Sequence, residues 1–409
     1  MPSHPCVHDR REFLTAVAVT PLVALWWNRA RGQTVQVPAV ARAPDYASRR
    51  ARLARLGEQA GMSGFFVPPG SSCQYLLGTS FGRSERLTAV LLGSDGKSAL
   101  VAPMFEAIGL GSIDGVDQII TWQEEENPYA RVAKFFSSAS TPRIGIEETA
   151  SYRHYVELRR ALGDAALVEG SPIIDQLRMV KDAYEIEQLR AAIRPTLAVI
   201  DAVHRQVKLG MTEREISALA AQAYRDRDAG AGSWHLCQVD ATAAMPHAAG
   251  SDRVLQEGSV LLIDTGTRMA GYCSDITRTV QVGQPRGAFK EVHEVVREAQ
   301  RRAQAAAGPG VPCAELDRIA RDVIARAGFG AAFLHRLGHG IGLDGHEPPY
   351  LVGGNECRLE VGMTFTIEPG IYLKDRFGVR IEDMFVVTEN GCAALSPLTT
   401  GPVGIEPAA

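Results

Sequence analysis

The sequence has few of the features that mark thiolate metal sites, nucleic-acid binding or disorder. Its seven cysteines among 409 residues include no Cys-x-x-Cys pair, which argues against a thiol-rich zinc site or a redox motif. The 43 basic and 47 acidic residues leave a net charge of −4 and form no basic stripe, so binding to nucleic acid is not expected. A disordered chain is also excluded, because 45% of the residues are hydrophobic.

Long hydrophobic runs are scarce, and the one that exists lies at the N-terminus. Residues 15–27 are almost uncharged and follow Arg10-Arg11-Glu12-Phe13-Leu14, but a membrane-spanning helix needs ~20 apolar residues. A charged start, a short apolar stretch and small residues near Ala30 are typical of a secretory signal, here resembling the twin-arginine type. We therefore predict a signal at 1–32, a linker at 33–44, a periplasmic location and no stable membrane anchor.

The remaining chain divides into two predicted domains. Short apolar segments, among them 64–67, 118–122 and 143–147, alternate with helical segments and indicate an α/β domain over 45–174. A new helical segment begins after it, so we place the second domain at 175–409.

An internal repeat organises this second domain. A helix predicted at 183–208, interrupted by Pro195, is followed by a glycine, a helix with a Thr212/Glu215 capping box, and strand-like segments. The same order recurs one hundred residues later, with matching pairs Gly210/Gly310, Glu215/Glu315, Ile216/Leu316 and Ala220/Ala320. This pattern predicts a duplicated helix-helix-sheet unit whose two sheets face a shared cleft, a suitable place for a site.

The strands of the first repeat carry two acidic residues. Asp264 ends the apolar run 260–266, and Asp275 lies in the strand-like segment 272–279. A turn at Met269/Ala270 would set the two carboxylates opposite one another, with Cβ atoms ~5 Å apart. Like charges at that spacing are destabilising unless a cation lies between them.

The second repeat contains an equivalent acidic pair. Glu368 lies in the segment 364–372 and Glu382 in 379–384. A fold about Asp375 pairs these two residues and places Arg380 on the same face as Glu382, because side chains alternate along a strand.

A histidine completes the predicted constellation. His339 stands between Gly338 and Gly340, which permit close backbone approach. Four carboxylates and one imidazole form an oxygen-rich set suited to hard or borderline divalent ions. The charge exceeds what one ion needs, so we predict two metals ~3.5–4 Å apart, bridged by water or hydroxide. The predicted ligands are Asp264, Asp275, His339, Glu368 and Glu382.

These residues resemble the M24 metallopeptidases of the pita-bread fold, the group of methionine aminopeptidases, Xaa-Pro aminopeptidases and prolidases. The resemblance covers roughly 181–397, and the preceding 45–172 resembles the creatinase-type N-terminal domain of the prolidase branch. It implies an α/β (α+β) fold, with a creatinase-like domain before a pita-bread domain. It also implies a dinuclear centre, with manganese first and cobalt, zinc or iron as alternatives, and a homodimer.

Further motifs favour the proline-specific branch. The segment Met245–Ala248 resembles the family's Pro-His motif, and the segment Gly345–Pro348 resembles its His-Glu motif. The resemblance implies that His247 assists at the scissile bond and that His346 contacts the substrate carbonyl or the tetrahedral intermediate. It also makes Glu368 both ligand and proton carrier, and Arg380 the group that orients an acid and holds charge in the cleft.

Two departures from the family pattern affect substrate choice. Asp240 and Thr242 stand where relatives often carry Gly-x-Asn. Pro349-Tyr350 occupies the stretch where many prolidases place an arginine that holds the substrate's terminal carboxylate. Either Arg380 or Tyr350 takes that role, or the substrate is longer than a dipeptide.

The function implied by the resemblance is metal-dependent hydrolysis of the Xaa-Pro bond in dipeptides by a hydroxide that bridges two divalent ions. Two alternatives remain open. One is an Xaa-Pro aminopeptidase that acts on longer peptides, and the other is a hydrolase or lyase that uses the same metals on a small non-peptide substrate.

Overall fold

The computed structural model describes residues 44–108, 113, 116–137, 142–163 and 165–408. The predicted signal at 1–32 and nearly all of the predicted linker at 33–44 lie outside the described residues. Within the described part of the chain, no helix is long and apolar enough to cross a membrane.

The first part of the described chain is a mixed sheet with helices packed against it. The sheet order is β4-β3-β2-β1-β5-β6. β1 pairs with β2 in antiparallel and with β5 in parallel orientation. The strands are β1 (Gly64–Val67), β2 (Ala89–Gly93), β3 (Ser98–Pro103), β4 (Gln118–Trp122), β5 (Arg143–Ile146) and β6 (Ala166–Glu169). The helices are α2 (Tyr46–Gln59), α3 (Ser71–Leu77), α4 (Met104–Ala107), α5 (Pro128–Phe135), α6 (Tyr152–Leu162) and α7 (Ser171–Met179).

The second part contains two helix pairs and two larger sheets. The helices are α8 (Ala183–Gln206), α9 (Glu213–Arg225), α10 (Gly287–Ala306) and α11 (Cys313–Arg326), with short 3₁₀ turns at Asp240–Thr242 and Gly330–Ala332. One sheet has the order β19-β11-β8-β7 and the other β13-β12-β14-β17-β18. The strands of the first are β7 (Trp234–Val239), β8 (Val260–Gly266), β11 (Ile276–Val282) and β19 (Gly404–Ile405). The strands of the second are β12 (Gly338–Gly340), β13 (Glu347–Leu351), β14 (Thr364–Ile367), β17 (Asp383–Thr388) and β18 (Gly391–Ala394). Two small ribbons are formed by β9 (Arg268–Met269) with β10 (Tyr272–Cys273), and by β15 (Gly370–Leu373) with β16 (Phe377–Arg380).

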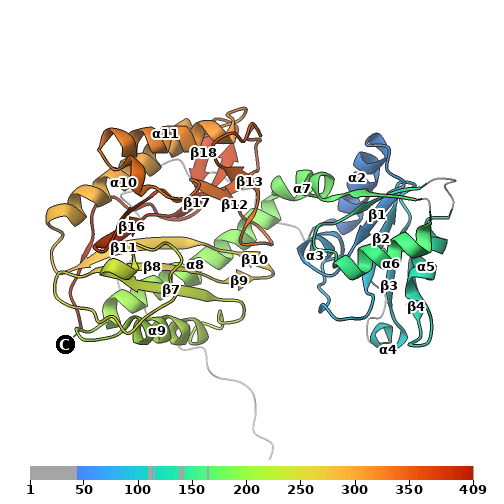
Figure 1. The fold of residues 1–409 in the computed structure, drawn as a ribbon, viewed down its shortest axis with the longest axis horizontal. Coiled ribbons are helices and arrows are strands. Elements are labelled where there is room, and N and C mark those ends of the chain that lie inside the picture. Colours follow the sequence, from blue (N-terminus) through green and yellow to red (C-terminus); the bar gives the residue numbers. More distant parts are fainter. Residues whose placement is uncertain (1–43, 109–112, 114–115, 138–141, 164, 409) are drawn as a thin grey trace, which may run out of the picture. The chain divides into compact units, whose positions relative to one another are not determined.

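The predicted duplication is visible in the backbone. Within this part, α8 and α9 lie on one side of the sheets, and α10 and α11 lie on the other (Figure 1). The N–H of Gly210 donates to the carbonyl of Leu255 at 2.8 Å, and the N–H of Gly310 donates to Leu359 at 2.8 Å. In both repeats, the glycine between the two helices therefore bonds to the segment that precedes a sheet strand, β8 or β14.

The helix boundaries follow the expected signals with one difference. The Thr212/Glu215 capping box begins α9 as expected. Pro195 does not divide the preceding helix, because α8 runs through it as one element. Packing on the face that contains Leu189, Val199 and Val203, all of them buried, holds the helix together despite the missing backbone donor.

The hairpin registers differ from the prediction in the first repeat. Asp264 pairs with Thr277, not with Asp275, because β8 and β11 are shifted by two residues from the expected alignment. A shift of two keeps each side chain on its original face. In the second repeat the register is as expected: Ile367 pairs with Asp383, and Gly370 pairs with Arg380. The strands are interrupted between these pairs, where Glu368 and Glu382 lie.

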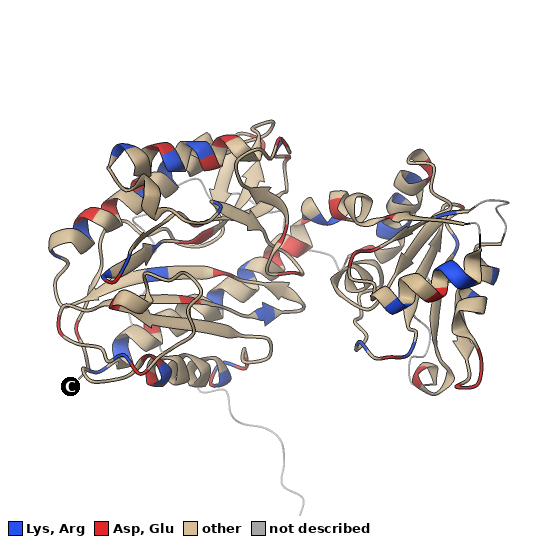
Figure 2. Cartoon of the chain, viewed as in Figure 1, with Lys and Arg blue, Asp and Glu red and all other residues tan. Residues whose placement is uncertain are grey.

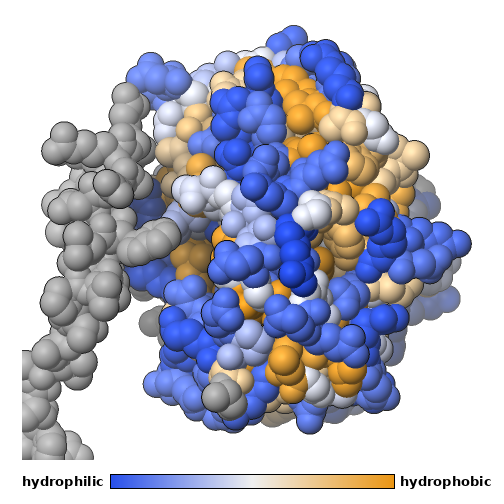
Figure 3. All heavy atoms as spheres, turned by 90° about the vertical axis from the view of Figure 1, so that its left-hand side faces the viewer, coloured by the Kyte–Doolittle hydropathy of each residue, from blue (hydrophilic) through white to orange (hydrophobic). Residues whose placement is uncertain are grey.

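The surface matches the weak net charge. Along the described helices, lysine and arginine are interspersed with aspartate and glutamate (Figure 2). The face in Figure 3 mixes hydrophilic with hydrophobic residues in the same way. No strong electrostatic steering of a charged partner follows from such a surface.

Buried histidines outside the cleft make stability depend on pH. His293 in α10 is 1% exposed, and its Nδ1 has no partner among the described residues. Burial lowers its pKa from 6.5 to about 4, and the nearby Arg297 and Arg278 act in the same direction.

Between those two pKa values the unfolded chain binds the extra proton, so the free energy of unfolding should fall as the pH drops from 6.5 towards 4. One such group contributes at most about 3 kcal/mol. We expect urea unfolding at pH 7 and pH 5 to show a smaller pH dependence for His293→Asn than for the unchanged protein. Equal pH dependence in both proteins would contradict this assignment.

Candidate active site

The predicted site residues line one cavity of about 320 Å³ between the two repeats. Glycines allow the strands to approach there, since a Cβ at Gly338 would collide with the carbonyl oxygen of Thr366, and one at Gly340 with that of Pro348. The lining residues are His247, Asp264, Asp275, His335, Arg336, His339, His346, Glu368, Arg380 and Glu382. The cavity therefore contains all five predicted metal ligands.

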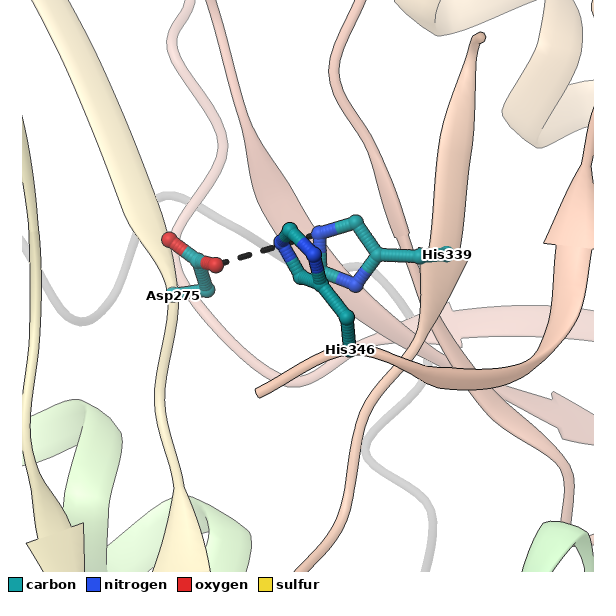
Figure 4. A group of neighbouring side chains, drawn as sticks. All are labelled: Asp275, His339 and His346. Carbon is teal, nitrogen blue, oxygen red and sulfur yellow. Dashed lines mark ion pairs between the residues drawn. The ribbon is translucent and has the colours of Figure 1, made fainter. Parts of the chain in front are cut away.

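The imidazole of His339 lies at the centre of the acidic group. Its Nδ1 is 3.0 Å from the carbonyl oxygen of Gly340. A carbonyl can only accept, so Nδ1 carries the proton and Nε2 presents a lone pair. Nε2 lies 3.2 Å from Glu368 Oε1, 3.8 Å from Asp275 Oδ2 and 4.0 Å from Glu382 Oε1. Figure 4 shows Asp275, His339 and His346 pointing towards one another from different segments.

The carboxylates are buried so close together that their charges oppose one another. The pKa of Asp275 and that of Glu382 are raised well above their usual values, first by burial and then by the neighbouring carboxylates. Burial acts to raise the pKa of Glu368, but the His339 ring when it is protonated, together with His335 and Arg380, lowers it to about 2.

This donor set fits divalent cations. Asp264 Oδ1 and Glu382 Oε1 are buried and have no hydrogen-bond partner in the described part of the chain. Unpaired buried acceptors are costly, and Glu382 Oε1 lies 4.0 Å from His339 Nε2. Carboxylate oxygens with an imidazole nitrogen are ligands that such ions accept. Three overlapping groups of side chains at the cavity have ligand atoms within 4.8 Å of one another, and one of these groups joins His346 to Asp275 and His339.

Arg380 is the buried cation that joins the two repeats. It is 2% exposed, and its Nη2 donates to Asp264 Oδ2 at 2.7 Å. Its Nη1 donates to the hydroxyl of Tyr372 at 2.9 Å, and its Nε donates to Thr277 Oγ1 at 3.2 Å. The predicted role of orienting an acid thus falls on Asp264 rather than on Glu382.

Thr277 orients Glu382 instead. Its hydroxyl donates to Glu382 Oε2 at 2.7 Å while it accepts from Arg380. The strand register places Thr277 opposite Asp264, so one hydroxyl connects the carboxylates of both repeats.

The two predicted substrate histidines lie at the cavity, whereas Tyr350 does not line it. The ring of His346 is tilted by 49° against that of His339, with 3.9 Å between the ring centroids. Burial, with His339 and Arg336, lowers the pKa of His346 to about 4, so its ring is neutral at pH 7. Tyr350 lies beneath the guanidinium of Arg336, 4.4 Å from the ring centroid. Tyr350 is not among the residues that line the cavity, and its direct contact with substrate stays a prediction.

Two lining residues were missed by the sequence reasoning. His335 Nε2 lies 2.7 Å from the hydroxyl of Tyr372, which in turn accepts from Arg380. Arg336 Nη2 lies 3.4 Å from His346 Nδ1. Both precede the Gly-His-Gly segment directly, and that adjacency was the available signal.

The Thr277 hydroxyl yields a test of the cation site. Thr277→Val keeps the side-chain volume but removes the bond that orients Glu382. We expect it to weaken Mn²⁺ binding, measured by calorimetry on metal-stripped protein, by about 10- to 100-fold. Thr277→Ser keeps the hydroxyl and should bind like the unchanged protein. Undiminished affinity in Thr277→Val would show that this hydroxyl does not support the site.

Comparison with known proteins confirms the resemblance inferred from the sequence. The model of the creatinase/prolidase N-terminal domain matches residues 49–180, and that of metallopeptidase family M24 matches residues 187–389. The chain is 36% identical to the probable dipeptidase PepE of Mycobacterium tuberculosis, over 86% of this chain and 94% of the relative. It is 36% identical to the Xaa-Pro dipeptidase of Lactobacillus helveticus, over 78% of this chain and 88% of the relative. The crystal structure of dipeptidase PepE from Mycobacterium ulcerans superposes with a TM-score of 0.83 at 37% identity, covering 88% of this chain and 98% of that one. This chain therefore belongs to metallopeptidase family M24, in the group that carries a creatinase/prolidase N-terminal domain, and it is a hydrolase.

Proposed function

We propose that this protein hydrolyses the Xaa-Pro bond of dipeptides with the help of two divalent ions. The observation that carries the proposal is the convergence of four carboxylates, two buried and two half-buried, and one buried imidazole from both repeats on one cavity, with acceptor atoms left unpaired. The names of the relatives, an Xaa-Pro dipeptidase among them, supply the substrate class.

Five side chains would hold the ions: Asp264, Asp275, His339, Glu368 and Glu382. We propose manganese first, with cobalt, zinc or iron as alternatives, because such a donor set selects weakly among them. When bound, such ions lower the pKa of a coordinated water from 15.7 to ~7 and so supply a nucleophile at neutral pH.

Glu368 is placed to take the proton from the attacking water. Its lowered pKa keeps it a carboxylate at neutral pH. Oε1 is engaged by Thr366 Oγ1 at 3.2 Å and lies 3.2 Å from His339 Nε2. Oε2 makes no hydrogen bond within the described residues and is the atom we assign to the proton.

The two histidines act as donors at the scissile bond. His346 is neutral, and its Nδ1 faces the guanidinium of Arg336, which can only donate. Nε2 then carries the ring proton and can stabilise the developing oxyanion. Proline nitrogen has no N–H in the peptide and must be protonated to leave as an amine, so a general acid is needed nearby. We assign that proton delivery to His247, which lines the same cavity.

Arg380 orients the acids and does not contact substrate. Its three hydrogen-bond partners occupy Nη1, Nη2 and Nε, and the side chain is buried. Its charge also lowers the pKa of Glu368. Together these contacts keep Asp264 in position and Glu368 ionised.

We also propose that the mature protein is periplasmic and forms a homodimer. The Arg10-Arg11 pair before a short apolar stretch supports export. Fractionation of cells that express the full chain should place it in the periplasm, and Arg10→Lys with Arg11→Lys should retain it in the cytoplasm. Equal distribution of both forms would refute the export proposal. Light scattering tests the dimer, and a monomer mass would refute it.

Turnover by reconstituted protein tests the function. Metal-stripped protein should be inactive towards Ala-Pro and should regain activity with Mn²⁺, or with Co²⁺, Zn²⁺ or Fe²⁺. Asp264→Ala should lose metal binding and turnover together, by more than ~100-fold. Asp252→Asn, at an exposed aspartate paired with Arg214, is the control and should remain active.

The substrate series separates the alternatives. A higher rate on Ala-Pro-Ala than on Ala-Pro would identify an aminopeptidase for longer peptides. Full metal occupancy with no cleavage of any Xaa-Pro substrate would overturn the peptidase proposal and favour a small non-peptide substrate.

A further inference from the structure

Two arginines line the cavity, and they differ in how many of their N–H donors are free to bind a ligand. Arg380 is buried, with hydrogen bonds from three of its nitrogens to Asp264, Tyr372 and Thr277. It therefore has little capacity to hold a carboxylate of the substrate. The sequence had left this role to Arg380 or Tyr350, and the structure favours neither.

Arg336 has the capacity that Arg380 lacks. Its side chain is half-buried at the cavity. No carboxylate of the described chain lies within ion-pair distance of it, whereas the neighbouring Arg321 is paired with Asp317 at 2.7 Å. A guanidinium is always charged and presents five donors in a planar fork. At this cavity it is a charged donor without a charged partner.

Two neighbours fix the position of the Arg336 guanidinium. The ring of Tyr350 lies 4.4 Å from it, within the range of a cation–π contact. On another side, Nη2 lies 3.4 Å from His346 Nδ1. An arginine held in this way loses less conformational entropy when a ligand binds. Tyr350 thus supports the arginine rather than the substrate.

The distance between Arg336 and the acidic group around His339 fits one residue of a substrate peptide. The His346 ring separates Arg336 from His339, with 3.4 Å on one side and 3.9 Å between the imidazole centroids. One residue of an extended peptide spans ~3.5 Å. A scissile carbonyl beside His346 therefore brings the carboxylate of the next residue within reach of Arg336.

We propose that Arg336 binds the terminal α-carboxylate of an Xaa-Pro dipeptide and so makes this chain a dipeptidase. This inference rests on the proposed function and adds the residue that selects substrate length. A longer peptide presents a neutral amide at the same place and forfeits the charge-assisted bidentate contact. Arg336 thus replaces, from the preceding segment, the arginine that is absent at 349–350.

Substrate pairs that differ only in this charge test the proposal. Arg336→Gln should lower kcat/KM for Ala-Pro by about 10- to 100-fold more than kcat/KM for Ala-Pro-amide, because an effect through the neighbouring His346 is common to both substrates. Arg336→Lys keeps the positive charge but lacks the planar set of N–H donors. Its kcat/KM for Ala-Pro should lie between that of Arg336→Gln and that of the unchanged protein. The matched control is Arg376→Gln, because Arg376 also stacks on an aromatic ring, that of Phe377, but lies outside the cavity.

A binding measurement separates this proposal from the proposed function. Calorimetry should show that metal-loaded protein binds L-proline more tightly than L-prolinamide, and that Arg336→Gln removes the difference. Loss of that difference with no turnover of any Xaa-Pro substrate would refute the proposed function and support the carboxylate site. If Arg336→Gln lowers kcat/KM equally for Ala-Pro and Ala-Pro-amide, or lowers it for neither, the assignment of Arg336 is overturned.

Discussion

The site depends on one buried ion pair, between Arg380 of the second repeat and Asp264 of the first, at 2.7 Å. Four carboxylates share the cavity, and burial with the repulsion of neighbouring carboxylates raises the pKa of two of them, Asp275 and Glu382. The guanidinium supplies a fixed positive charge inside this group and links the two sheets. Removal of one partner from such a pair leaves an uncompensated buried charge, which is strongly destabilising.

Duplication explains how so many acids meet. Each repeat supplies two carboxylates from the strand-containing segment that follows a helix pair, and an equivalent glycine, Gly210 or Gly310, lies in the turn between the two helices of each pair. Neither pair would be stable alone in an apolar environment. Placed face to face around His339, they form a set that divalent ions can satisfy. The folded protein therefore contains carboxylates that repel one another, and binding of divalent ions reduces this repulsion.

Particular residues show where sequence reasoning succeeded and where it could not. The five predicted ligands share the cavity because each lies within or within two residues of a strand, as the apolar segments of the sequence indicate. The pairing of Asp264 with Asp275 was wrong by two residues, since register in the first hairpin is set by contacts along β8 and β11. That error kept the correct face, so the cavity still contains both side chains.

By itself the sequence determined the fold class, the repeat and the chemical identity of the site, because periodicity, capping signals and acidic strands are local properties. Only the tertiary structure determines which arginine pairs with which carboxylate. Arg380 donates hydrogen bonds to Asp264, Tyr372 and Thr277. Arg336, in contrast, is half-exposed at the cavity and lies against the ring of Tyr350. Those assignments depend on distances between segments far apart in the chain, and no spacing within one segment encodes them.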